Sequence, residues 1–234
     1  YRLADQFDQD VLGYLSGYKQ SALHGTANAV NTTVNGSVAV STAATNELLA
    51  SMQVDAADFN SGSSGNSIVA VPRASGDSLN TTTAKASPLS IIARMSRKLD
   101  QQNVDTTGRW LVVDPVFAEL LQDEDSRLLN SDFGGSGLQN GLILNNVHGF
   151  KVYMSNNLPA VGNGATGATA TGSTHFGVIV GGHSSAVATA DSINKTETYR
   201  DPDSFADIVR GMHMYGRKIL RPEALTRAIY VSGI

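Results

Sequence analysis

Cysteine is absent from the sequence, which excludes both a disulfide framework and a thiolate metal site. The 234 residues are enough to bury a hydrophobic core without such cross-links. Long apolar runs are also missing, because stretches such as residues 177–180 fall far short of the roughly 20 residues of a membrane-spanning helix. The first residues contain no basic region followed by an apolar one, so no signal peptide is predicted. We therefore expect a soluble protein of a reducing compartment.

Charge is scarce as well. Charged residues make up 16% of the chain, whereas a typical soluble domain has roughly 25%. The net charge is −4 and the 17 lysines and arginines are scattered along the sequence. A protein that binds DNA by neutralising phosphates needs a dense basic surface, so tight or sequence-specific DNA binding is not expected. A surface with so little charge favours contact with other protein molecules, because self-repulsion is weak.

The first 20 residues have the periodicity of an amphipathic helix. The apolar positions are Leu3, Phe7, Val11, Leu12, Leu15 and Tyr18. Acidic and amide residues occupy the other positions, which predicts one long helix over residues 2–20. From residue 24 to residue 86 the pattern gives way to Gly, Ser, Thr and Asn. This stretch predicts an excursion over the surface, with a helical patch near 45–52 and a strand near 67–71.

Two capping signals mark the middle of the chain. Ser87 followed by Pro88 is typical of a helix start, and an apolar stripe over residues 89–99 predicts the helix that follows. After a predicted turn at 105–108, residues 110–113 predict a buried strand. Asp114 followed by Pro115 then caps a short helix that ends near residue 121.

The second half of the chain is predicted to be mostly strands. Residues 141–147 and 150–155 indicate two strands joined by a turn at His148 and Gly149. A Gly/Ala/Thr tract at 160–173 indicates a loop, and 176–180 a strand. We then expect a helix at 184–193, an extended segment at 195–200, a long strand at 205–220 and a final strand at 228–232.

Two glycine patterns have the spacing of phosphate-binding motifs without their context. Residues 162–167 match G-x-G-x-x-G, but no amphipathic helix follows, and Val187 stands where an acidic residue would bind a ribose. Residues 211–216 have the phosphate-loop spacing, but Arg217 and Lys218 replace the Lys-Ser/Thr pair. We therefore expect no nucleotide cofactor.

No residue is assigned to catalysis or to a metal. The histidines are His24, His148, His175, His183 and His213, and none is spaced like a zinc pair. A helix cap is the expected role of His183–Ser185, with Asp191 nearby. The alternative is a hydrolase that uses His183 and Ser184, but the sequence has no G-x-S-x-G elbow to position the serine. The acidic residues 123–125 are either a solvated face or a contact with a neighbour's arginine.

The order of these elements, together with several phrases, resembles major capsid proteins of tailed double-stranded DNA bacteriophages with the Hong Kong 97-type fold. The phrases are GRWLVVDP at 108–115, HGFKVYMSNNLP at 148–159, DPDSF at 201–205 and the segment 215–234. They are most similar to those of short-tailed cyanophages, and the resemblance covers nearly the whole chain.

The resemblance implies an α+β fold with a peripheral and an axial domain. The peripheral domain would comprise residues 1–108, with the spine helix and a surface insertion at 24–86, together with return strands at 192–220. The axial domain would comprise residues 109–191 and a closing strand at 221–234. The family's N-terminal arm and extended loop would precede Tyr1 and lie outside this sequence.

The resemblance also implies the function. Copies of the chain would assemble into pentamers and hexamers of an icosahedral capsid, formed in the host cytoplasm and enclosing DNA without sequence-specific binding. Portal, scaffolding and decoration proteins of the phage would be the partners, with no catalytic residue, no cofactor and no membrane. An encapsulin-type bacterial nanocompartment shell is the alternative with the same fold.

Overall fold

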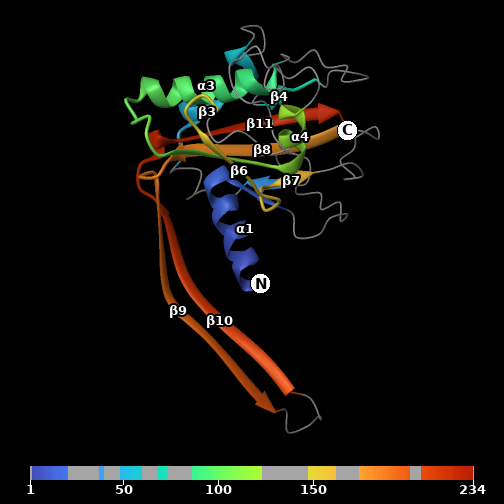
Figure 1. Ribbon diagram of the computed structural model, residues 1–234, viewed down its shortest axis with the longest axis vertical. Helices are drawn as coiled ribbons and strands as arrows, with labels where there is room; N and C mark the ends of the chain where they lie inside the picture. Colours follow the sequence, from blue (N-terminus) through green and yellow to red (C-terminus); the bar gives the residue numbers. More distant parts are fainter. Residues whose placement is uncertain are drawn as a thin grey trace.

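The computed structural model describes residues 2–20, 37–39, 48–59, 68–72, 86–122, 147–161, 174–200 and 207–233. These residues form a body around a mixed β-sheet and a long two-stranded ribbon that projects from it (Figure 1). Helix α1 (Arg2–Ser16) lies between the sheet and the upper part of the ribbon. The molecule is therefore a compact body with one extended arm.

The body is organised on a 7-stranded sheet with the order β3-β11-β8-β5-β6, to which β4 is added beside β11 and β7 beside β8. Its strands are β3 (Gln53–Val54), β4 (Ile68–Ala70), β5 (Arg109–Val113), β6 (Lys151–Met154), β7 (Ala160–Val161), β8 (Thr174–His183) and β11 (Leu225–Gly233). The two central strands, β8 and β11, each contain an apolar run, at 178–180 and 228–231, in which Val178, Ile179 and Ile229 are fully buried. Such runs suit strands that are covered on both faces.

Helix α3 (Pro88–Gln101) packs across β11, in the upper layer of Figure 1. The predicted cap is confirmed: the Ser90 amide donates to the Ser87 hydroxyl over 3.3 Å, and Pro88 fills the first helical position. The apolar stripe is buried in the core, with Ile92 and Leu99 fully excluded from solvent. The capping residue and the apolar stripe both favour a helix over the same residues, so α3 forms here.

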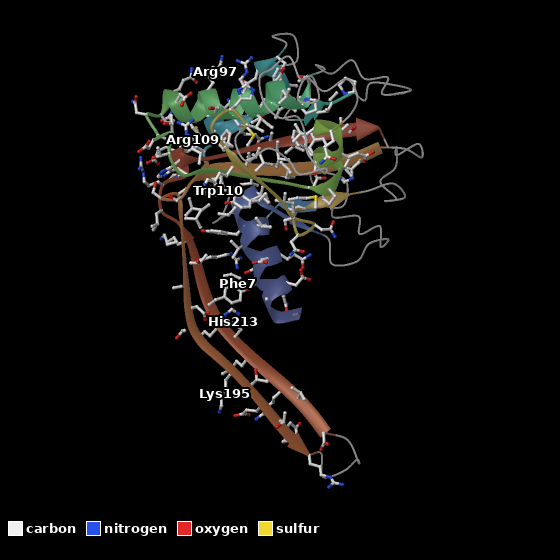
Figure 2. The ribbon with its side chains drawn as sticks, viewed as in Figure 1. Phe7, Arg97, Arg109, Trp110, Lys195 and His213 are labelled. Carbon is white, nitrogen blue, oxygen red and sulfur yellow. The ribbon has the colours of Figure 1, made fainter. Side chains whose placement is uncertain are left out.

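Arg109 joins the end of α3 to the start of β5, and Figure 2 labels it there. Its guanidinium is buried and donates to the Asp100 carboxylate over 2.7 Å and to the Val104 carbonyl over 2.6 Å. A second carbonyl, that of Asp105, accepts from Nε over 2.8 Å. Each of these bonds stabilises the turn at 105–108 that the sequence predicts.

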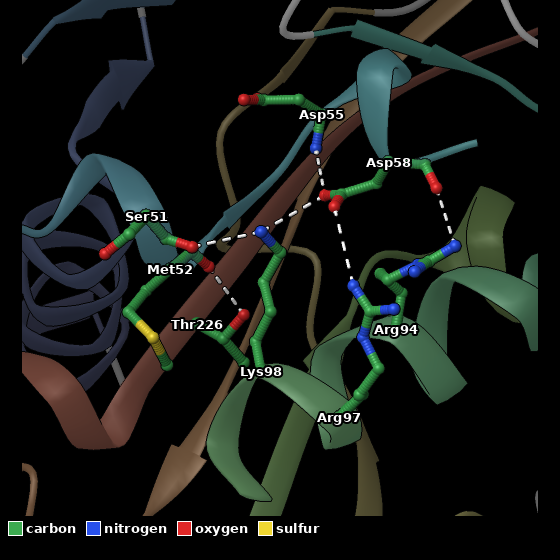
Figure 3. Close-up of polar contacts among 8 residues, drawn as sticks. All are labelled: Ser51, Met52, Asp55, Asp58, Arg94, Arg97, Lys98 and Thr226. Atoms are coloured by element: carbon green, nitrogen blue, oxygen red, sulfur yellow. Dashed lines mark hydrogen bonds and ion pairs between the residues drawn. The ribbon is translucent and has the colours of Figure 1, made fainter. Parts of the chain in front are cut away.

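Residues 48–59 lie beside α3 and are joined to it by polar contacts (Figure 3). This segment contains η1 (Ala50–Met52), β3 and η2 (Ala56–Asp58). The Asp58 carboxylate pairs with Lys98 over 3.2 Å, while the Asp58 carbonyl accepts from Arg94 over 2.6 Å. Lys98 also donates to the Ser51 carbonyl over 3.0 Å. These polar contacts hold residues 48–59 against α3, at the edge of the sheet where β3 pairs with β11.

A buried polar network links helix α4 (Pro115–Leu121) to the two central strands. Asp114 caps α4 by accepting from the Phe117 amide, and its carboxylate also accepts from Tyr230 and from His175 Nε2, each over 2.7 Å. Burial, followed by the Asp114 charge, raises the pKa of Tyr230 well above its ordinary value. Tyr230 therefore stays protonated and remains a hydrogen-bond donor.

The remaining elements are short, except for the ribbon strands. They are β1 (Tyr18–Gln20), which pairs antiparallel with β2 (Ser37–Ala39), the ribbon strands β9 (Val187–Arg200) and β10 (Asp207–Ile219), and η6 (Pro222–Ala224) before β11. The predicted turn at His148 and Gly149 is confirmed, because both residues have positive φ (49° and 85°) and a bridge joins Val147 to Phe150. The first strand of the predicted hairpin, at 141–146, lies outside the described residues.

Two predicted helices need correction. The helix expected over residues 2–20 ends at Ser16, because Gly17 takes the left-handed conformation (φ 76°) that ends helices and residues 18–20 pair with β2. The helix expected at 184–193 is wrong, since β9 begins at Val187 and pairs with β10 along its length. Pairing with a distant strand overrides the local helix propensity of this alanine-rich segment.

The stretch 24–86 also differs from the expected surface excursion. Where the structure describes it, Val54 and Val69 are fully buried in the sheet beside β11. The helical patch near 45–52 is reduced to the single turn η1, and residues 45–47 lie outside the described part. At 160–173, residues 160 and 161 form β7 and the rest lies outside the described residues.

We predict that Gly177→Ala destabilises the body, because a Cβ at Gly177 would lie 2.6 to 2.9 Å from ring and hydroxyl atoms of Tyr230. Displacing Tyr230 strains the core and disturbs its bond to Asp114, at a cost of about 2 kcal/mol in the free energy of unfolding. Chemical denaturation measures the change. Gly216→Ala is the matched control, since its Cβ would meet nothing within 4 Å. Equal losses in the two variants would contradict the role of Tyr230.

Candidate interaction surface

The β9–β10 ribbon is an antiparallel pair that leaves the body between the two central strands. At its base, the amides of Leu220 and Arg221 donate to the Ala186 carbonyl over 2.9 and 3.2 Å. The register runs from Val187 opposite Ile219 to Arg200 opposite Asp207, with one shift between Met214 and Tyr215. A two-stranded ribbon has no core of its own, so its faces must be stabilised by other elements.

The inner face of the ribbon, formed by His213, Tyr215 and Arg217, lies against α1 (Figure 2). Phe7 packs edge-on against Tyr215 with ring centroids 4.7 Å apart, and against His213 at 5.5 Å. Asp10 accepts from the Tyr215 hydroxyl over 2.8 Å and forms an ion pair with Arg217. Near the body this face is therefore covered by the protein's own helix, whereas Val209, further along the same face, is 68% exposed.

Arg217 contacts two residues of α1, Asp10 and Tyr14. Its guanidinium lies over the ring of Tyr14, 4.9 Å from the centroid. Partial burial lowers the pKa of Arg217 below its ordinary value, although the group remains charged. Its charge therefore depends on the Asp10 carboxylate for compensation.

The outer face of the ribbon consists of Lys195, Glu197 and Tyr199 on β9, and Ile208, Arg210, Met212 and Met214 on β10, since residues paired in register share a face. Met212 and Met214 are each 52% exposed and Tyr199 is 45% exposed. Apolar side chains this exposed on an extended arm are typical of a surface that another molecule covers. Tyr, Met and Arg are also enriched in protein interfaces.

Charges alternate with the apolar groups on the outer face. Glu197 accepts from Arg210 over 2.7 Å and pairs with Lys195, and these hydrogen bonds lower the pKa of the Glu197 carboxyl. The Arg210 guanidinium also lies 5.3 Å from the ring centroid of Tyr199. Two cations share one carboxylate, so this face has a net positive charge on an otherwise acidic chain.

Only some of the motifs singled out in the sequence lie within the described residues. Residues 211–216 lie within β10, and 162–167, His24 and 123–125 lie outside the described residues. His183 accepts from the Ser185 amide in the β8–β9 turn, whereas Asp191 pairs with His213 on the ribbon. The described residues contain no group of His, Cys, Asp and Glu that could hold a metal, and none of their helices could cross a membrane.

The sequence predicted the long strand 205–220 but did not identify its exposed face. The alternation of Ile208, Met212 and Met214 with polar residues was a signal for a two-faced strand. Which face would be covered depends on the contact with α1, about 200 residues away in the sequence, and no local pattern encodes that contact.

Comparison with known proteins identifies the family. A family model described as phage capsid protein matches residues 1–228, which is nearly the whole chain. The chain belongs to the phage capsid protein family. The family is one of structural proteins of the phage capsid, in agreement with the expectation that the chain is not an enzyme. A search of curated proteins found no match.

Solved capsid structures have a similar fold. A chain of Mycobacterium phage Che8 has a TM-score of 0.57 and 24% identity over 98% of this capsid protein. The capsid of Cyanophage P-SCSP1u has a TM-score of 0.53 at 19% identity, and the mature capsid of bacteriophage PhiM1 has 0.53 at 16%. The last two matches cover 99% and 98% of the chain. The chain covers 59%, 62% and 62% of these three proteins, so it spans about three fifths of their length.

We predict that Asp10→Asn loosens the ribbon from α1, because it leaves the partly buried Arg217 without its counter-charge. The expected loss is about 1 kcal/mol in the free energy of unfolding, with faster amide exchange in β10 near Tyr215. Asp8→Asn is the matched control, since Asp8 is exposed on another side of the same helix. Unchanged exchange in Asp10→Asn would contradict the role of this ion pair.

Proposed function

We propose that the chain comes from a major capsid protein of a tailed double-stranded DNA phage, with the Hong Kong 97-type fold. The observation that carries the proposal is the projecting ribbon, whose outer face exposes Tyr199, Met212 and Met214. An exposed apolar arm is unfavourable in a protein that stays monomeric. In a shell subunit, the same arm can contact a neighbouring subunit.

The proposed domains follow this geometry. We assign the ribbon, which begins at Val187, and α1 to the peripheral part, for which the sequence-based division gave return strands at 192–220. The axial part comprises the described residues of 109–186, up to the start of the ribbon, and of 221–233, and we add helix α3 and residues 48–59 and 68–72 to it. This change rests on the burial of Ile92, Val54 and Val69 in the core of the sheet. The peripheral boundary at residue 108 therefore moves toward the N-terminus.

Assembly of many weak contacts explains how such a tile works. Copies related by rotation in pentamers and hexamers repeat one heterologous contact. The ring closes when the rotations between neighbouring copies add up to a full turn. Each subunit has several neighbours, so modest contacts sum to a stable shell. Portal, scaffolding and decoration proteins are the further partners proposed. The net charge of −4 supports a container that encloses DNA without gripping it.

Particle sizing of the purified full-length protein tests this function. We predict closed shells of uniform diameter by light scattering and electron microscopy above a critical concentration, since association is multivalent. A protein that remains monomeric at all concentrations and salt conditions contradicts the proposal.

The contents of particles from infected cells distinguish the encapsulin alternative. Nuclease-protected double-stranded DNA is expected for a phage capsid. A particle filled with an enzyme cargo and lacking DNA would instead assign the chain to a nanocompartment shell.

A further inference from the structure

The exposed side of α1 is the acidic counterpart of the ribbon's outer face. Phe7, Asp10 and Tyr14 point at the protein's own ribbon. At helical spacing, Asp5, Asp8 and Gln9 lie on the other side, while Leu12, further along that stripe, packs against the core of the body. Asp5 and Asp8 are exposed; the Asp5 carboxylate accepts from the side-chain amide of Asn157 over 2.8 Å, a neutral partner that leaves its charge uncompensated, and no described residue pairs with the Asp8 carboxylate. Helix α1 thus presents negative charge away from its own ribbon.

The outer face of the ribbon has the complementary character. Lys195 and Arg210 are 65% and 67% exposed in their side chains, and within the described residues they share Glu197 as their one counter-charge. Met212 is opposite Lys195 in the register, so an apolar side chain and a cation lie next to each other. Flexible methionine side chains adapt to the surface that they contact. The charged residues of the outer face determine which partner surface it binds, because the opposing charges must be complementary.

We propose that the outer face of the ribbon binds the exposed side of α1 on a second copy of this chain. In that contact Lys195 and Arg210 lie against Asp5 and Asp8 of the second copy, while Met212 packs on the helix between them. This inference rests on the proposed function and names the surfaces through which the subunits meet. Each α1 is then held between its own ribbon and that of a neighbour.

A symmetric contact between two ribbons is the weaker alternative. A two-fold axis near Met212 would bring Lys195 of one copy close to Lys195 of the other, and like charges face to face are unfavourable. The contact between ribbon and helix uses two different surfaces of one chain. It is therefore heterologous and repeats around a ring, as closure of a shell requires.

Reciprocal charge reversal tests the contact in the full-length protein. Asp8→Lys and Lys195→Glu should each raise the concentration at which particles form by about tenfold, because each places like charges at the contact. The double variant Asp8→Lys/Lys195→Glu should recover to within about threefold of the wild type, since the attraction is restored with its sign exchanged. Light scattering measures the midpoint, and circular dichroism verifies that all variants fold.

Lys151→Glu is the matched control, because Lys151 is exposed on β6 in the sheet and not on the ribbon. Recovery in the double variant alone supports the contact. Single variants that assemble like the wild type, singles that fail without recovery in the double, or an equal effect of Lys151→Glu would each overturn it. In those three outcomes the wild type still forms shells and the proposed function stands. A wild type that forms no particles contradicts both proposals.

Discussion

The pairing of β9 with β10 creates an arm with one face that no other described element covers. Along its inner face, Phe7 and Asp10 of α1 hold Tyr215 and Arg217, but the outer face with Met212 and Met214 is left in solvent. Two strands without a third layer are marginally stable in water. In the contact proposed above, a second copy covers that face, and the stability of the arm is then linked to the assembly of the shell.

The body fixes the direction of the arm. The ribbon is an excursion between β8 and β11, the two central and most buried strands of the sheet, and Leu220 and Ala186 close its base by a backbone hydrogen bond. The strands are in turn held to α4 by the Asp114 carboxylate, which accepts from His175 and Tyr230 inside the core. Rigid packing at the base lets weak contacts along the arm select one orientation between neighbours.

Local features of the fold could be predicted from the sequence, and long-range ones could not. Ser87 and Asp114 cap helices as their sequence context indicates, and the turn at His148 follows from its glycine neighbour. The helix expected at 184–193 failed because β10 supplies backbone partners that local propensity does not register. The pairing of Asp10 with Tyr215 joins residues 205 positions apart, so no spacing in the sequence announces it. The family resemblance was visible because it depends on the order of short phrases and not on contacts.

Amide hydrogen exchange, followed in the free subunit and in the assembled particle, tests the central claim most directly. If a neighbouring copy covers the ribbon, exchange in residues 187–200 and 207–219 slows markedly on assembly, while β8 and β11 are protected in both states. Ribbon amides that exchange at the same rate in the free and assembled protein would contradict the account.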